Sequence, residues 1–114
     1  LVMNTENGLS ANLNKIEFGQ VWKIQVEGGY RYGLVVSPNS MNQQLDKIIV
    51  VAISARKKSW PTRLAFRLQN KSRQLCLEDI ASLSKEAFQE KIQVLSLAEL
   101  ARVKVGLRQT LGEF

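Results

Sequence analysis

Two stretches of the chain, residues 18–27 and 62–68, alternate apolar and polar side chains. Successive side chains of a β-strand point to opposite faces, so this period of two predicts half-buried strands. Two further stretches, residues 30–37 and 47–55, contain nearly continuous apolar runs rich in Val and Ile. Such runs are typical of central strands that are covered on both faces.

Short polar segments separate these predicted strands. Gly28 and Gly29 indicate a tight hairpin turn, because glycine accepts the positive φ angles that such turns require. Residues 39–46 predict a loop or a short helical turn, and residues 69–72 predict another turn. Two more strands are expected after it, a bent one over residues 73–83 and a short one over residues 91–95.

A different spacing marks the end of the chain, where residues 97–111 predict a helix. Ser96 and Glu99 form a capping box, in which each side chain satisfies a free backbone amide at the start of the helix. Gly112 is placed to end it. The apolar face carries four residues at helical spacing: Leu100, Val103, Leu107 and Leu111. A shorter helix with a serine cap is expected over residues 84–88.

Together these elements predict a fold that is mainly β with α. Five or six antiparallel strands in meander order would form a small twisted sheet or a partly closed barrel, with the C-terminal helix across one end or face. The chain has 114 residues, enough for one core but not for two. Residues 1–17, polar and rich in Asn, are expected to form a flexible arm, and residues 18–114 a single domain.

The composition favours a basic protein with an anionic partner. The chain carries 16 Lys and Arg against 10 Asp and Glu, a net charge of +6. This suits nucleic acid, a membrane surface or an acidic protein, although a basic protein without such a partner has the same composition. No apolar run approaches the ~20 residues that span a bilayer, and no signal sequence is recognised. The single Cys76 excludes an internal disulfide and favours a reducing cytoplasm.

The residue types that the chain lacks narrow its chemistry. It has no His, which excludes a His-based triad and a His-ligated metal. One cysteine cannot build a zinc site, and the adjacent Glu78 and Asp79 would point to opposite faces of a strand. No metal or cofactor is therefore expected. Any catalysis must use Arg, Lys, Ser, Thr, Tyr or the substrate itself.

One candidate site follows if residues 30–37 and 47–55 pair as an antiparallel hairpin. The start of one strand then lies beside the end of the other, which brings Arg31 next to Ser54. A basic and aromatic loop would form the rim: Arg56, Lys57, Lys58 and Trp60. Cations and an aromatic ring suit RNA phosphates and bases. The structural alternatives are a surface arginine, a serine that bonds the backbone, and a loop whose tryptophan folds onto the sheet or contacts a dimer partner.

Four ordered segments resemble the MazF/PemK family of toxins, small ribonucleases of toxin–antitoxin systems. They are Gly19-Gln20-Val21-Trp22, Arg31-Tyr32-Gly33-Leu34-Val35-Val36-Ser37-Pro38, Ile49-Val50-Val51-Ala52-Ile53-Ser54 and Leu75-Cys76-Leu77-Glu78-Asp79-Ile80-Ala81-Ser82-Leu83-Ser84. With the closing helix they cover the chain from Gly19 to the C-terminus. No single segment is decisive, but the ordered set is specific.

The resemblance implies a small SH3-like antiparallel barrel of the CcdB/MazF type with a C-terminal helix, usually a homodimer. It implies the toxin of a type II system, cytoplasmic and inhibited by a cognate antitoxin protein. The implied activity is metal-independent, sequence-specific cleavage of single-stranded mRNA to 2′,3′-cyclic phosphate and 5′-hydroxyl ends. The family's key arginine falls on Arg31 and its key threonine on Ser54. A common glutamine associated with RNA binding falls on Asp79.

The chemistry implied by this resemblance agrees with the absence of histidine. RNA carries its own nucleophile, the 2′-hydroxyl, so the enzyme has only to position it and to stabilise charge on the phosphate. The chain departs from the family where a long first loop is reduced to residues 27–30, and where Tyr32 replaces a proline. Two alternative hypotheses are a catalytically weak relative that binds nucleic acid or protein, and a CcdB-like gyrase inhibitor.

Overall fold

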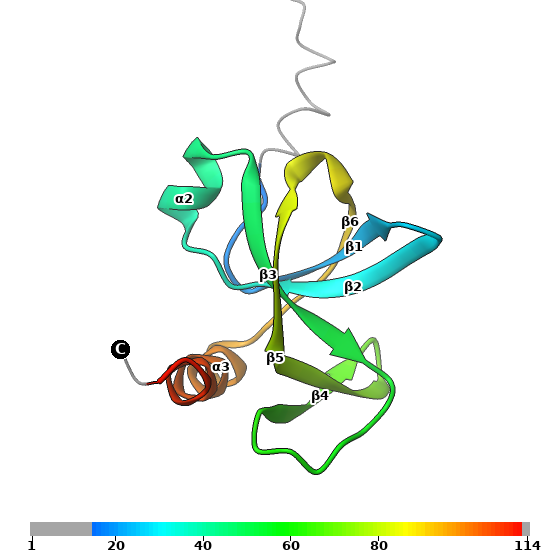
Figure 1. Cartoon of the computed structure of the whole chain (residues 1–114), viewed down its shortest axis with the longest axis vertical. Coiled ribbons are helices and arrows are strands. Elements are labelled where there is room, and N and C mark those ends of the chain that lie inside the picture. Colours follow the sequence, from blue (N-terminus) through cyan, green and yellow to red (C-terminus); the bar gives the residue numbers. More distant parts are fainter. Residues whose placement is uncertain (1–14, 113–114) are drawn as a thin grey trace, which may run out of the picture.

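The computed structural model describes residues 15–112, which form one six-stranded sheet with helices at its margins (Figure 1). Most of the predicted arm, residues 1–14, lies outside the described residues. The strands are β1 (Gln20–Val26), β2 (Gly29–Val35), β3 (Lys47–Ser54), β4 (Arg63–Leu68), β5 (Lys71–Ser84) and β6 (Phe88–Val94). The helices are α2 (Asn39–Gln44), the 3₁₀ turn η1 (Lys85–Ala87) and α3 (Leu97–Thr110).

The strand order across the sheet is β4-β5-β3-β2-β1-β6, and every neighbouring pair is antiparallel. The prediction of a mainly β fold with a C-terminal helix is confirmed, but the predicted meander order is wrong beyond β3. β5 rather than β4 pairs with β3, because its 14 residues are long enough to pair with β3 on one side and β4 on the other. A tight turn at Gln69 and Asn70, with φ angles of 49° and 69°, folds β4 back along β5.

β5 is bent, as the sequence predicts, and the bend lies at one defined position. Its pairing with β3 skips residues 77–79 between Val51 and Ala52. Such a bulge turns a strand and increases its local twist. The two halves of β5 therefore run in different directions in Figure 1, and the sheet curls into a partly closed barrel. Glu78 and Asp79 lie at this corner.

Two of the three predicted helical segments form helices, and the third forms only a short turn. α3 begins with the expected capping box, in which Glu99 N–H donates to Ser96 Oγ at 3.1 Å and Ser96 N–H donates to Glu99 Oε1 at 2.8 Å. Residues 39–46 contain the short helix α2. The helix predicted over residues 84–88 is only the turn η1, because Phe88 is buried against β1 as the first residue of β6. No helix within residues 15–112 is long and apolar enough to cross a membrane.

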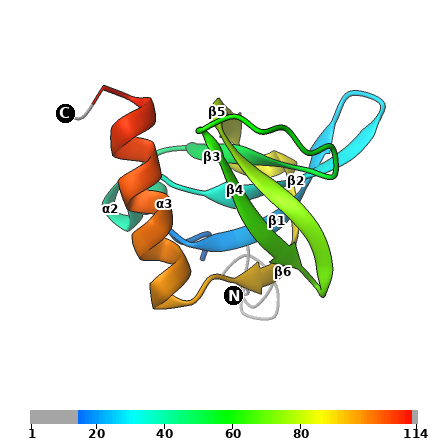
Figure 2. The same ribbon diagram turned by 90° about the horizontal axis from the view of Figure 1, so that it is seen from below.

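Hydrophobic cores form on both faces of the sheet. Leu34 and Val51 are buried in the first core, to which α3 contributes its inner face (Figure 2). Their neighbours Val35 and Val50 are buried in the second core, because successive side chains of a strand point to opposite faces. This explains the continuous apolar runs of β2 and β3. Ile16 is 2% exposed in the second core, so the packed part of the chain begins before the predicted boundary at residue 18.

Candidate active site

The sheet opens between β2 and β3. These strands pair from Val35↔Val50 only as far as Gly33↔Ala52. The first residues of β2 continue along β1, whereas the last residues of β3 continue along the first half of β5. The two strand pairs diverge in Figure 1, and an open hollow of ≈ 660 Å³ lies in the fork. We call it the fork hollow.

The fork hollow brings together Arg31 and Ser54, the two residues predicted to form one site. The β2–β3 pairing ends two residues before them, at Gly33↔Ala52, so Arg31 and Ser54 lie on the two sides of the fork rather than as a cross-strand pair. The side chain of Arg31 is exposed, and Ser54 is half-buried. An exposed guanidinium beside a hydroxyl can hold a phosphate from two sides.

The Ser54 hydroxyl is bonded to the backbone of the residue that follows the strand. Its Oγ accepts a hydrogen bond from Arg56 N–H at 3.0 Å and lies 3.3 Å from the Arg56 carbonyl oxygen. This is the backbone-bonding role named above as the alternative. The accepted bond holds Oγ in place, whereas the hydroxyl hydrogen makes only a long contact and can rotate towards a ligand.

The lining of the fork hollow is strongly basic. It includes four arginines: Arg31, Arg56, Arg63 and Arg73. Among its described lining residues Asp79 is the only acidic one. Within residues 15–112 no group of three or more His, Cys, Asp or Glu side chains could hold a metal ion. The hollow thus suits an anion such as a phosphate diester.

Arg63, at the start of β4, is held inside the protein, with a side chain that is only 10% exposed. Its Nε donates to Glu78 Oε2 at 2.7 Å, and its Nη1 donates to Gln74 Oε1 at 3.2 Å and to the Arg56 carbonyl at 3.3 Å. The guanidinium carbon also lies 4.7 Å from the centre of the Trp60 ring, in a cation–π contact. Arg63 therefore ties the loop after β3 to β5.

Glu78, on the β5 bulge, holds this network from the other end. It accepts hydrogen bonds from Arg63 and from Thr62 Oγ1, the latter at 2.6 Å. Burial raises the pKa of the Glu78 carboxyl, but the bonds from Thr62, the backbone and Arg63, with the charge of Arg63, outweigh it and lower the pKa below its usual value. Glu78 is thus an ionised anchor at neutral pH.

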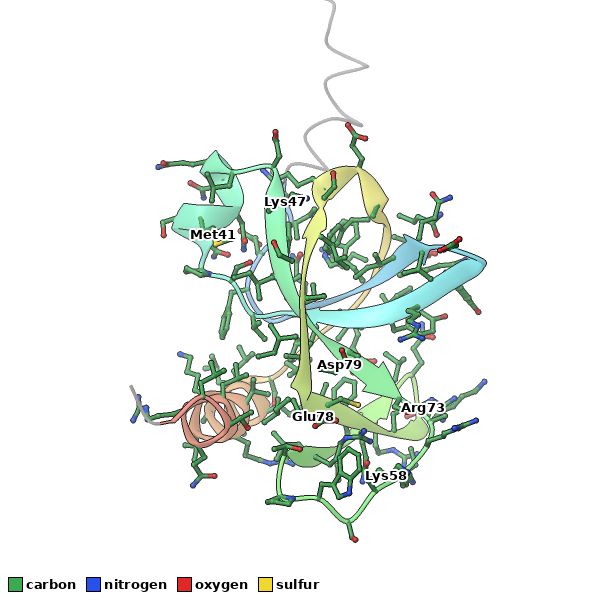
Figure 3. All side chains as sticks on the ribbon, in the orientation of Figure 1. Met41, Lys47, Lys58, Arg73, Glu78 and Asp79 are labelled. Atoms are coloured by element: carbon green, nitrogen blue, oxygen red, sulfur yellow. The ribbon has the colours of Figure 1, made fainter. Side chains whose placement is uncertain are left out.

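The predicted RNA rim is divided by the structure. Arg56 lines the fork hollow, but Lys57, Lys58 and Trp60 do not. The loop is fastened to β5: Lys57 Nζ donates to Ser72 Oγ, and the backbone N–H and carbonyl of Lys58 each bond the Gln74 side chain at 3.0 Å. Figure 3 shows Lys58 on the side of the fork away from β2. The RNA-binding role of these residues stays a prediction.

Trp60 lies between its own loop and β4. The residue is 48% exposed. The ammonium of Lys58 lies 5.5 Å and the guanidinium carbon of Arg63 lies 4.7 Å from the centre of its ring. The ring thus folds back towards the sheet, as the structural alternative expects. About half of its surface still faces solvent, where a base could stack.

A second, apolar hollow of ≈ 290 Å³ adjoins the fork hollow, and we call it the small hollow. Its small residues Gly33, Ala52 and Ala81 leave the space open. Tyr32 lines both hollows. A hydrogen bond with Tyr30, together with partial burial, raises the pKa of Tyr32.

Sequence reasoning missed Arg63 and Arg73 as parts of the site. Both occupy polar positions in strand segments, and such positions usually face solvent. The signal that could have found them is the register of β5 against β3 and β4. The skipped residues 77–79 shift that register, and no sequence pattern marks a bulge of this length. Cys76 is 2% exposed, and burial raises the pKa of its thiol.

Comparison with known protein families shows to which family the chain belongs. Residues 17–111 match the family described as PemK-like, MazF-like toxin of type II toxin–antitoxin system. The chain belongs to this toxin family. The resemblance in the ordered segments is therefore confirmed, and the match spans nearly the whole part of the chain that the structure describes. A comparison with curated protein sequences finds no match.

Solved structures share the fold of this PemK/MazF-family chain. An endoribonuclease in complex with its cognate antitoxin, from a mycobacterial species, is 20% identical, with a TM-score of 0.77 over 85% of this chain and 95% of that one. A MazE–MazF complex from Deinococcus radiodurans contains a chain that is 22% identical, with a TM-score of 0.76 over 87% and 97%. The Mycobacterium tuberculosis toxin MazF-mt6 is 10% identical, with a TM-score of 0.74 over 82% and 96%. These likenesses confirm the predicted MazF-type fold.

Proposed function

We propose that this toxin-family chain is a metal-independent, sequence-specific endoribonuclease that cleaves single-stranded mRNA, with Arg31 and Ser54 at its catalytic centre. The observation that carries the proposal is the fork hollow, where an exposed arginine and a hydroxyl share one strongly basic surface. Family membership supports the assignment, as do the structural neighbours that are endoribonucleases.

The proposed reaction uses the nucleophile of the substrate. The 2′-oxygen of one ribose loses its proton and attacks the adjacent phosphorus, while the bond from phosphorus to the 5′-oxygen breaks and that oxygen gains a proton. The products are a 2′,3′-cyclic phosphate and a 5′-hydroxyl, so no water is consumed. Arg31 binds the phosphate and stabilises its developing charge, and the Ser54 hydroxyl hydrogen turns towards a phosphate oxygen.

Incubation of the protein with a defined single-stranded RNA in EDTA tests this proposal. Cleavage with cyclic-phosphate ends that disappears in Arg31→Ala is the expected result. Cleavage that EDTA abolishes, or that Arg31→Ala retains in full, contradicts it. An intact RNA together with trapped gyrase–DNA complexes would instead support the CcdB-like alternative.

A second candidate function is a binding module for nucleic acid or protein. One observation favours it: the Ser54 hydroxyl already contacts the Arg56 backbone at 3.0 and 3.3 Å. A module of this kind binds RNA in EDTA without cleaving it, and Ser54→Ala leaves its affinity unchanged. The same incubation, read by fluorescence anisotropy as well as by gel, separates the two functions.

The proposal extends to partners and location. We expect a homodimer, inhibition by a cognate antitoxin protein, and action in the cytoplasm, where mRNA and a reduced Cys76 are both found. The antitoxin complexes among the structural neighbours support the inhibitory partner. Light scattering of the purified chain tests the dimer. Rescue of growth by a small open reading frame next to the gene tests the antitoxin.

A further inference from the structure

The fork hollow and the small hollow share one wall. Four residues line both of them: Arg31, Tyr32, Ala52 and Asp79. On one side of this wall the surface is rich in arginine, and on the other side it is mostly apolar. A phosphate site directly beside an apolar cavity has the layout of a nucleotide, whose charged phosphate and flat base lie on either side of a sugar.

The small hollow has room for one base because its floor lacks side-chain bulk. Gly33 and Ala52 face each other across β2 and β3, and Ala81 on β5 pairs with Val50 of β3. A Cβ atom on Gly33 would lie only 3.0 Å from Ile24 Cδ1, so any larger residue would crowd this floor. The resulting ≈ 290 Å³ is ample for a nucleobase.

The polar groups around the small hollow determine which base it suits. Beside Arg31, which the proposed function assigns to the phosphate, Asp79 and Glu27 line it, and ionised carboxylates only accept hydrogen bonds. Guanine presents two adjacent donors, N1–H and the 2-amino group, that fit the two oxygens of one carboxylate. Adenine and cytosine present one amino group each. Uracil presents a single N–H between two carbonyl oxygens, which a carboxylate repels.

We propose that the small hollow is a guanine-selective base pocket next to the phosphate bound by Arg31, with Asp79 as the residue that selects the base. The inference rests on the proposed function for its ligand, an RNA strand. Figure 3 shows Asp79 at the corner of β5, facing the opening between β2 and β3. From this corner it lines the mouth of the small hollow and the edge of the fork hollow at once.

Binding to short 2′-O-methyl RNAs tests the pocket without cleavage, because a methylated 2′-oxygen cannot attack phosphorus. The probes are oligouridylates in which one central position is guanine, adenine, cytosine or uracil. The wild-type chain should bind the guanine probe roughly tenfold more tightly than the all-uracil probe, as expected for one bidentate base contact. Asp79→Asn, which replaces one acceptor by a donor, should remove most of this preference.

A second variant fills the pocket instead of changing its charge. Ala81 lines the small hollow and not the fork hollow, so Ala81→Leu should abolish the guanine preference while RNA still binds through its phosphates. The matched control is Ala65→Leu on β4, an exposed position that lines neither hollow and should bind all probes like the wild type.

The outcomes separate this inference from the proposed function. Equal affinity for all four probes, or a guanine preference that persists in both Asp79→Asn and Ala81→Leu, overturns the pocket while leaving cleavage to be judged on its own. Guanine-selective binding by a chain that cleaves no RNA in EDTA supports the pocket and contradicts the endoribonuclease. Loss of antitoxin binding but not of base preference in Ala81→Leu would assign the hollow to a protein side chain instead.

Discussion

Arg31 and Arg63 line the same hollow but are held in opposite ways. Arg31 is exposed at the start of β2. The side chain of Arg63 is 10% exposed, and its nitrogens donate to Glu78, Gln74 and the Arg56 carbonyl. A guanidinium that is already paired within the protein has little capacity left for a phosphate. The comparison indicates that one arginine serves the substrate and the other serves the shape of the site.

This contrast separates residues that act on RNA from residues that place them. The bond from Arg63 to the Arg56 carbonyl reaches the loop that follows Ser54, and Ser54 Oγ bonds the same Arg56 backbone. The position of the hydroxyl therefore depends on Arg63, although Arg63 itself is largely buried. The following predictions test this division of roles, beginning with the largest expected effect.

Arg31→Ala should lower single-turnover cleavage of RNA in EDTA by about 10²–10³-fold, the usual loss when one group that stabilises transition-state charge is removed. The free energy of unfolding should stay within about 0.5 kcal/mol of the wild type, because the side chain is exposed. Cleavage rates and urea unfolding of the same preparation measure both quantities. A large loss of stability would assign Arg31 a structural role.

Arg63→Ala should destabilise the fold by about 2 kcal/mol, because it leaves Glu78 as a partly buried carboxylate without its charged donor. Cleavage at a temperature where the variant is folded should fall by a smaller factor than in Arg31→Ala. Arg67→Ala on the same strand is the matched control, since that exposed side chain makes one bond, to the Asn70 carbonyl. Equal destabilisation by both variants would contradict a special role for Arg63.

Ser54→Ala should reduce cleavage by about fivefold, the effect of one neutral hydrogen-bond donor worth about 1 kcal/mol. Ser54→Thr should retain activity, because it keeps the hydroxyl and its extra methyl limits the χ1 rotamers. Comparing kcat and KM separates the roles: a contact made in the transition state lowers kcat, whereas a binding contact raises KM. Full activity of Ser54→Ala would contradict a catalytic role and would mean that the wild-type hydroxyl serves only to bond the Arg56 backbone.

The smallest expected effect is a pH dependence that comes from Glu78. The pKa of its carboxyl is lower in the folded chain than in the unfolded chain, so the unfolded state binds its proton more tightly. The stabilisation is complete above the ordinary value of 4.5 and is lost as the pH falls through the lower, folded pKa. Urea unfolding at neutral and acidic pH should show this loss in the wild type and a weaker one in Glu78→Gln. An identical pH profile for Glu86→Gln, an exposed glutamate, and for Glu78→Gln would remove the basis for this assignment.

The sequence predicted much of the fold because its patterns are local. Period-two alternation, the Gly28-Gly29 turn and the capping box at Ser96 each depend on a few neighbouring residues, and all three appear in the structure. The position of β4 at the edge of the sheet could not be predicted in this way. β4 lies at the edge because β3 pairs with β5 instead. That pairing depends on the length and the bend of β5, which are properties of the whole sheet.

The candidate site likewise contains residues placed by local strand pairing and residues placed by the bend of β5. Arg31 and Ser54 lie just beyond the paired part of one short hairpin, whose register follows from two neighbouring strands. Arg63 and Arg73, which the sequence did not single out, reach the fork hollow from β4 and β5, as does Asp79, which only the family resemblance singled out. Their approach depends on the bulge at residues 77–79, which sequence alone does not mark. Similarly, the two adjacent hollows require the curl of the whole sheet.

The most direct measurement of the central claim uses an RNA whose cleavage position has been mapped with the wild-type chain in EDTA. The ribose on the 5′ side of the broken bond is then replaced by 2′-deoxyribose, and single-turnover cleavage is repeated. The account predicts cyclic-phosphate ends for the all-ribose RNA and no cleavage of the substituted strand at that position. Cleavage of the 2′-deoxy strand there, or the failure of the wild-type chain to cleave any all-ribose RNA in EDTA, would contradict it.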